Sequence, residues 1–269
     1  MIVEIFGLIL VAVFTGVFSG LLSIGGNMIA IPVLLVLFKH FIHIPDQTAM
    51  HMALCSGVVV MVFTTFSSVM THKKNNNIDW GFYKSIALYM VAGAVLGAHC
   101  VLLINGKVLE KVFGIFLLFV SLKLLHSKMQ QKNSKQEHHV VKLNVFVMAI
   151  IGILIGFKSG LLGIGGGLII IPLMIHLGFS GPKISGTTSA CSLTMALTSA
   201  ITLLILNYGV DLGIKYSYGN IYIPAVLVMI PFTMIFAKVG AKLSTKFSNK
   251  TLSNIQLITV VILAIKMLA

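Results

Sequence analysis

Long runs of apolar residues fill almost the whole chain, and short polar stretches separate them. A helix needs roughly 20 apolar residues to cross a hydrocarbon core about 30 Å thick. Six runs have about this length, and they lie at 48–71, 79–104, 108–126, 184–206, 220–240 and 251–268. We expect each of them to form one transmembrane helix.

Two further apolar runs are too long for one crossing, at 5–38 and 144–177. The first would be about 51 Å long as one straight α-helix, at 1.5 Å per residue. Both runs contain consecutive glycines near the middle, at 23–26 and 163–167. Because consecutive glycines weaken a helix and allow positive φ, we predict a break at each site. The second helix of each run then begins near Asn27 or Gly167.

The two broken runs are copies of one pattern. The segments GLLSIGGNMIAIPVLL at 20–35 and GLLGIGGGLIIIPLMI at 160–175 are identical at 9 of 16 positions. Further matches lie 143 residues apart, such as Lys107 with Lys250. Such duplication is typical of transporters whose site lies between the halves. We predict three regions: a first membrane repeat at 1–126, a cytoplasmic linker at 127–143 and a second membrane repeat at 144–269.

The distribution of lysines favours inverted repeats. If each broken run crosses the membrane once, the loop lysines divide seven to seven. If each run instead enters the membrane and returns as a hairpin, ten lysines share one face and four the other. The richer face is cytoplasmic by the positive-inside rule. The predicted fold is an all-α integral membrane protein of two inverted repeats, each a re-entrant helical hairpin followed by three transmembrane helices, with both termini outside.

Composition supports the membrane assignment and excludes other classes. The chain is 58% hydrophobic and 9% charged, and its net charge of +13 comes from 19 lysines without arginine. Basic loops beside membrane spans explain this charge, so we predict no nucleic-acid partner. Glu4 stands where a cleavable signal would carry Lys or Arg, so residues 1–20 are expected to remain as a membrane segment. Cys55, Cys100 and Cys191 lie in apolar spans without CxxC spacing, which indicates packing residues.

The helix breaks form the first candidate binding site. A helix that begins inside the bilayer leaves backbone N–H groups without intrahelical partners, and its positive dipole end attracts anions. We predict that two such ends together bind a small anion, through Ser23, Gly25, Gly26 and Asn27 in the first repeat and Gly163, Gly165, Gly166 and Gly167 in the second. Close helix packing better explains the glycines spaced by four, which are Gly16, Gly20, Gly152, Gly156 and Gly160.

Polar residues of the following span extend the candidate site. They are Thr187, Thr188 and Ser189, with Ser192 nearby, and Ser56 at the roughly equivalent place of the first half. Hydroxyl groups can donate to an anion, but Ser and Thr also bond to the preceding helical turn, and both interpretations are open.

Lys158 is a separate candidate, because it lies in an apolar stretch where the first repeat has Phe18. A lysine at this depth is costly enough to indicate function, and the alternative is a side chain that extends to the membrane surface.

No metal site, cofactor or catalytic centre is predicted. His138 and His139 have no Cys or carboxylate cluster beside them. His51, His72 and His99 lack a partner carboxylate within sequence reach, so we interpret them as structural or interfacial residues. The chain contains no HExxH, GxSxG or P-loop motif, which disfavours an enzyme and an ATP-driven pump. We therefore predict a secondary transporter, driven by an ion gradient such as H⁺ or Na⁺, by a substrate gradient or by a partner; a homodimer is left open.

The doubled element SGLLxIGGxxIxIP, at 19–32 and 159–172, resembles the TauE/SafE family of sulfite and organosulfonate exporters, as do the threonines and serine at 187–189 and NIDW at 77–80. The similarity covers nearly the whole chain. It implies a multi-pass protein of the bacterial cytoplasmic membrane that moves small sulfur-containing or carboxylate anions, usually outward. Ser23 and Asn27 replace glycines of the second copy, so the first half-site is more polar. The alternative is a membrane-embedded accessory or assembly factor, in which the glycines only pack helices.

Overall fold

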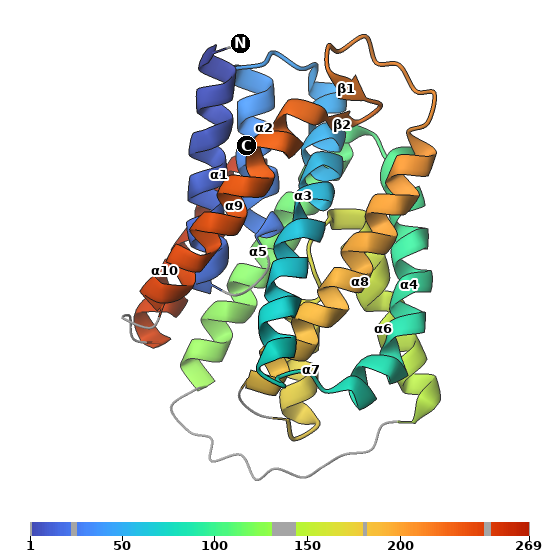
Figure 1. The fold of residues 1–269 in the computed structure, drawn as a ribbon, viewed down its shortest axis with the longest axis vertical. Helices are drawn as coiled ribbons and strands as arrows, with labels where there is room; N and C mark the ends of the chain where they lie inside the picture. The colour runs from blue at the N-terminus through green and yellow to red at the C-terminus, as the bar shows by residue number, and fades with distance from the viewer. Residues whose placement is uncertain (1, 23–25, 131–143, 180–181, 245–248, 269) are drawn as a thin grey trace.

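The computed structural model of the 269-residue chain describes residues 2–22, 26–130, 144–179, 182–244 and 249–268. These residues form ten α-helices and one short β-hairpin (Figure 1). In chain order the elements are α1 (Ile2–Leu22), α2 (Asn27–His40), α3 (Asp46–Lys74), α4 (Trp80–Leu103), α5 (Gly106–Gln130), α6 (Val145–Leu162), α7 (Gly167–His176), α8 (Pro182–Leu206), β1 (Ser217–Tyr218), β2 (Ile221–Tyr222), α9 (Ile223–Ser244) and α10 (Asn249–Leu268).

Both predicted helix breaks are confirmed. α1 ends at Leu22 and α2 begins at Asn27, while α6 ends at Leu162 and α7 begins at Gly167. Gly163 ends α6 in the left-handed conformation, with φ at 63°, and its N–H donates to the carbonyl of Ser159 over 2.8 Å. This is the C-terminal geometry that glycine adopts without steric cost. The sequence therefore sets where each long apolar run turns.

Five of the described helices are long and apolar enough to cross a membrane. They are α3, α4, α6, α8 and the Ile223–Gly240 part of α9. Large apolar side chains such as Leu88, Leu103 and Phe119 are exposed on the outside of the bundle, as contact with lipid requires. α5 carries two lysines and Glu110 within six residues of its start and is not among the five, so the crossing at 108–126 stays a prediction.

The boundaries of two predicted elements need correction. Residues 220–222 were assigned to a membrane helix, but β2 pairs with β1 there and α9 begins only at Ile223. α5 continues to Gln130, into the segment assigned to the linker at 127–143. The remainder of that segment, with His138 and His139, lies outside the described residues.

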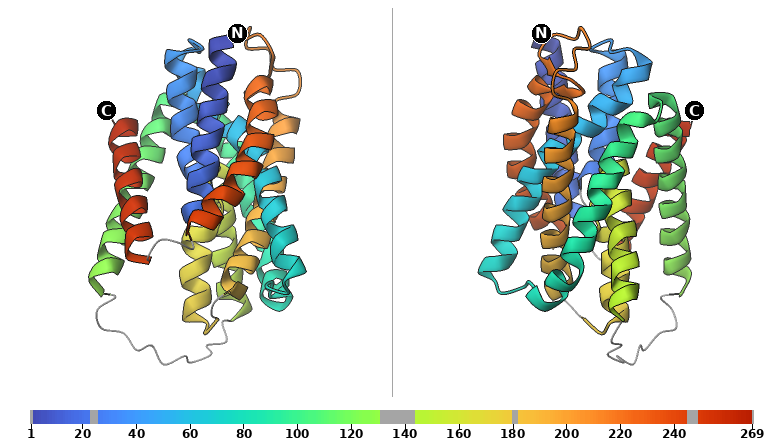
Figure 2. Two further views of the ribbon diagram at one scale, coloured as in Figure 1. Left: turned by 60° about the vertical axis from the view of Figure 1, so that its left-hand side comes forward. Right: turned by 90° about the vertical axis from the view of Figure 1, so that its right-hand side faces the viewer.

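The α1–α2 and α6–α7 pairs enter the bundle from opposite ends (Figures 1 and 2). The open end of the α1–α2 pair lies at the end of the bundle that holds the N-terminus, which we call the upper end. The α2–α3 and α4–α5 connections lie at the same end. The second pair opens at the lower end, beside the α3–α4 turn. The second helix of each pair is short, with 14 residues in α2 and 10 in α7. Both tips therefore lie inside the bundle.

The most extensive contacts between helices follow the same pattern in both halves of the chain: where two of these helices pack together, their counterparts in the other half also do. Counting from each N-terminus, α1 to α5 correspond to α6 to α10. α3 packs against its counterpart α8, and α5 against its counterpart α10. α1 packs against α9, and the counterpart of this contact is α6 against α4, which is also present. Each half therefore supplies the packing surface for the first helix of the other half.

Glycines make these contacts close. A Cβ on Gly156 or Gly160 of α6 would collide with the backbone of α4 at Met90 or Ala94. Gly152 meets Ile86 and Tyr89, and Gly16 of α1 meets Thr233 and Phe236 of α9. The packing interpretation is thus confirmed for these four glycines, because only a missing side chain lets the backbones approach this closely. The surroundings of Gly20 are outside the described part of the chain.

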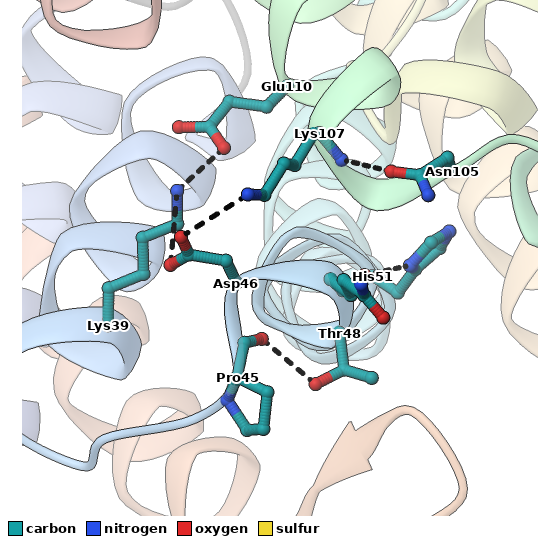
Figure 3. A network of polar contacts seen from close by, with 9 residues as sticks. Lys39, Pro45, Asp46, Thr48, His51, Asn105, Lys107 and Glu110 are labelled. Atoms are coloured by element: carbon teal, nitrogen blue, oxygen red, sulfur yellow. Dashed lines mark hydrogen bonds and ion pairs between the residues drawn. The ribbon is translucent and has the colours of Figure 1, made fainter.

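A polar network joins the elements at the upper end (Figure 3). The ammonium of Lys39, at the end of α2, lies 2.7 Å from Glu110 and 3.8 Å from Asp46. Lys107 lies 3.9 Å from the other oxygen of Asp46. The ring of His51 is buried, with Nε2 at 2.9 Å from the carbonyl of Ile104 and 3.1 Å from that of Val101. His51 therefore fastens α3 to the end of α4, which agrees with a structural role.

Candidate functional site

The two hairpin tips meet through one side chain. Asn27 is the first residue of α2, and only 3% of it is exposed. Its Nδ2 donates a hydrogen bond of 2.9 Å to the carbonyl oxygen of Gly163, at the other tip. Gly57 of α3 lies beside this amide, and a Cβ there would be in ordinary contact with Nδ2 at 3.5 Å. The predicted proximity of the two breaks is therefore confirmed for these two residues.

Side chains of α3 and α8 enclose the second tip. A Cβ on Gly163 would lie 2.9 Å from Val58. A Cβ on Gly165 would lie 2.9 Å from Oγ of Ser192 and 3.0 Å from Met61. At Gly166 the nearest atoms are the flexible ends of Ile170 and Met195. On this side the described neighbours of the tip are thioethers and aliphatic groups, together with the hydroxyl of Ser192.

Among the described residues, no side chain caps the start of either second helix. Gly26 and Gly166 occupy the N-cap positions of α2 and α7, and no acidic residue follows in either first turn. The carbonyl of Gly26 accepts from Ile29 and Ala30, and that of Gly166 accepts from Ile169 and Ile170 in the same way. The two starts therefore have the same backbone geometry, and each directs an uncompensated positive dipole end into the protein.

Lys158 reaches the second tip from inside α6. Its Nζ donates to the carbonyl oxygen of Gly165 over 2.9 Å. The same nitrogen lies 5.5 Å from the centre of the Phe116 ring, which is within the range of a cation–π interaction. The ammonium thus remains at the helix break and does not extend along the lipid-facing surface. Lys158 braces the turn whose carbonyl it binds.

Three of the predicted hydroxyl groups form hydrogen bonds with other parts of the bundle. Oγ1 of Thr187 accepts from the N–H of Asp79 over 2.8 Å, and Oγ of Ser189 lies 3.0 Å from Oγ of Ser68. Oγ of Ser56 accepts from the N–H of Tyr222 over 2.9 Å. No described hydrogen bond joins these three to a hairpin tip. Thr188 is buried, and its hydroxyl has no partner in the described part of the chain.

Two residues of the first tip, Ser23 and Gly25, lie outside the described residues. Gly26 is described, and a Cβ on it would lie 2.9 Å from Oγ of Ser19. Sequence reasoning did not single out Ser19, although this serine begins the first copy of the repeated motif.

Comparison with known proteins assigns the chain to a family. The model of the family described as "Sulfite exporter TauE/SafE" matches residues 8–267. A "Probable membrane transporter protein" of Haemophilus influenzae is 26% identical over 260 residues, which cover 96% of each chain. A similarly named protein of Methanocaldococcus jannaschii is 29% identical over 246 residues, which cover 91% of this chain and 88% of the relative. No solved structure matches the chain. This protein therefore belongs to the sulfite exporter TauE/SafE family of multi-pass membrane transporters, which is not a family of enzymes.

Proposed function

We propose that this protein is a secondary transporter that exports small anions, such as sulfite, organosulfonates or related carboxylates, across the bacterial cytoplasmic membrane. The family supports the substrate class. The main support for a site between the tips is that α2 and α7 both begin, at Gly26 and Gly166, without a described side-chain cap. The hydrogen bond from Asn27 to Gly163 joins the two tips. Two helix N-termini and an amide, without a carboxylate beside them, favour an anion over a cation.

Asn27 and Lys158 have complementary roles in this proposal. The Nδ2 group of Asn27 carries two hydrogens, so one can stay on the Gly163 carbonyl while the other donates to the anion. The Lys158 ammonium has three donors and uses one described bond, to Gly165. A bound anion would share these groups with the backbone. Thr187, Thr188, Ser189 and Ser56 belong to the proposed path of the anion, on the helices that surround the tips.

We propose that the two halves are inverted repeats. Hairpins that open at opposite ends, helix contacts that map onto themselves and ten lysines against four on the two faces support this arrangement. Inverted repeats allow alternating access, because exchanging the conformations of the two halves opens the site to the other side. An H⁺ or Na⁺ gradient would drive export, and both termini would lie outside.

Flux of sulfite in proteoliposomes tests the function. We expect uptake into inside-out vesicles with the wild type, and loss of flux with Gly166→Leu, because the added side chain fills the second tip. Ala92→Leu adds similar bulk on an exposed face of α4 and should leave flux unchanged. Both variants must elute as monodisperse protein. A wild type that moves no sulfite or organosulfonate under a gradient would favour the accessory-factor alternative.

Thiol labelling tests the inverted arrangement. In a background without Cys55, Cys100 and Cys191, single cysteines are placed at Asn76, Ser248 and Lys215. The inverted arrangement expects protection of Asn76→Cys and Ser248→Cys from an impermeant reagent applied outside, and labelling of Lys215→Cys. If each broken run instead crossed the membrane once, Asn76→Cys and Lys215→Cys would behave alike and Ser248→Cys would differ.

A further inference from the structure

We propose that a pocket at the lower end is a separate capture site for soluble sulfonates and other small oxyanions, from which they enter the transport path. The pocket has a volume of about 380 Å³ and is lined by Lys73, Asn76, Ile78, Trp80 and Lys183. These residues come from the end of α3, the α3–α4 turn, the start of α4 and the start of α8. The transport part of this proposal rests on the function proposed above, whereas binding in the pocket does not.

The lining combines the donors that an oxyanion needs with an apolar surface. Lys73 and Lys183 supply two ammonium groups, and Asn76 supplies an amide. Trp80 is 44% exposed, so its ring can contact the organic part of a sulfonate and its indole N–H can donate. Only Asp79 opposes this charge at close range among the described residues, at 3.9 Å from Lys183. The rim therefore keeps a net positive charge, which selects anions.

The turn that carries the pocket is held in one conformation. Asn76 adopts the left-handed conformation, with φ at 54°, and the N–H of Asn77 bonds to the carbonyl of His72 to close the end of α3. This is a Schellman-type helix end, in which asparagine is one of the few residues tolerated besides glycine. Oδ1 of Asp79 then caps α4 by accepting from the N–H of Phe82 over 2.8 Å.

The α3–α4 turn also contacts α8 directly, at Gly186 and Thr187. A Cβ on Gly186 would collide with the carbonyl of Asn77, so the helix and the turn touch through their backbones. One residue later, Thr187 accepts the hydrogen bond from the N–H of Asp79. The backbone around the pocket is therefore held in place, and anion binding needs to order mainly the two lysine side chains. The NIDW segment, which the hairpin site does not use, thereby acquires a role.

Hydroxyl groups of α8 lie at several levels of the helix between the pocket and the second tip, and they face different neighbouring elements. Above Thr187 come Ser189 with Ser68 of α3, and then Thr194, whose Oγ1 lies 2.7 Å from the hydroxyl of Tyr83. Between these levels Ser192 packs against Gly165. α8 thus extends from the pocket, near Thr187, to the second tip, at Ser192.

Trp80 is the only tryptophan of the chain, so its fluorescence reports on the pocket. Ethanesulfonate is titrated into the purified protein in zwitterionic nanodiscs, with chloride at equal ionic strength as the reference. We expect a saturable change in emission. The half-saturating concentration should rise about threefold to fivefold in Lys73→Gln or Lys183→Gln, as for an exposed ion pair, and about tenfold or more in the double variant. Lys215→Gln makes the same charge change at the upper end and should titrate like the wild type.

An anionic lipid headgroup presents the same chemistry, and a second arm separates the two sources. Nanodiscs that contain phosphatidylglycerol are compared with nanodiscs of phosphatidylcholine alone. A soluble ligand predicts saturation by ethanesulfonate in both. Emission that follows the lipid composition and does not respond to ethanesulfonate would overturn the proposal in favour of a lipid site.

The two proposals fail independently. Equal titrations of wild type and the Lys73→Gln/Lys183→Gln variant overturn the pocket, even if sulfite flux is normal. A normal titration without flux would instead refute transport and leave the pocket intact. If both hold, the double variant should show a raised KM for flux with a nearly unchanged maximal rate, because capture precedes the transport step.

Discussion

The two hairpin tips share a backbone design but carry different polar groups. In both, a glycine N-cap accepts hydrogen bonds from the third and fourth residues after it. At the first tip, Asn27 donates across to the other half, while its counterpart Gly167 has no side chain. At the second tip, Lys158 braces the carbonyl of Gly165, while its counterpart Phe18 has no donor. The two copies of the motif thus share the helix break and differ in the polar groups around it.

This difference gives the two tips unequal tasks. The first tip supplies a neutral donor and the second supplies the carbonyl that receives it, together with the only lysine described near either tip. A symmetric pair of helix ends would bind an anion equally from both sides. Here the charge lies with the α6–α7 hairpin, so we expect the anion to be held more strongly by the half that opens at the lower end.

The largest effect is expected where a glycine faces the backbone of another helix. A Cβ on Gly156 would collide with the carbonyl of Met90, whereas a Cβ on its counterpart Gly16 would lie 3.0 to 3.1 Å from Phe236 and Thr233. Gly156→Leu should prevent recovery of folded protein, because forced repacking of a tight contact costs more than the usual range of about 1–3 kcal/mol. Gly16→Leu should fold with a lower thermal midpoint. Size-exclusion profiles show whether each variant is recovered folded, and thermal denaturation gives its midpoint. If the two variants were equally stable, the contact at Gly156 would not be tighter than the contact at Gly16.

The next effect concerns the bond between the tips. Asn27→Gly gives the first tip the residue of the second and leaves the Gly163 carbonyl without its donor. A buried acceptor that loses its partner costs about 1–3 kcal/mol, so the thermal midpoint should fall clearly. Asn75→Gly removes an exposed asparagine and serves as the control. An unchanged midpoint in Asn27→Gly would mean that the bond contributes nothing to the stability of the fold.

The helix breaks could be predicted from sequence, because both reasons for them are local. Consecutive glycines oppose a helix, and an apolar run of 34 residues exceeds one crossing. The bond from Asn27 to Gly163 joins residues 136 positions apart, so only the packed structure reveals it. The hydrogen-bond partner of Thr187 could not be predicted for the same reason. The sequence does not indicate whether its hydroxyl contacts a hairpin tip or, as the structure has it, the N–H of Asp79.

A smaller effect on stability, with a distinct effect on binding, is expected at Lys158. Lys158→Met removes the bond to Gly165 and should lower stability by about 1 kcal/mol. Sulfite affinity should fall by more than the roughly 1 kcal/mol typical of an exposed ion pair, because a site of low dielectric screens the attraction poorly. Lys158→Arg should retain part of the affinity. Titration of sulfite into the wild type and both variants measures the three affinities. Equal affinities would show that Lys158 does not bind the anion.

The smallest effect is expected at the outer end of the first hairpin, where Lys39 pairs with Glu110 at 2.7 Å. The two side chains are only 20% and 17% exposed, whereas Lys107 and Asp46 are mostly exposed and 3.9 Å apart. Glu110→Gln keeps an acceptor for Lys39 but removes the charge, so stability should fall by no more than about 1 kcal/mol. Lys107→Gln should have less effect still. Since salt screens ion pairs, added salt should narrow the difference between wild type and Glu110→Gln in thermal denaturation. A difference that persists at high salt would show that Glu110 acts through its short hydrogen bond with Lys39 and not through an attraction that salt screens.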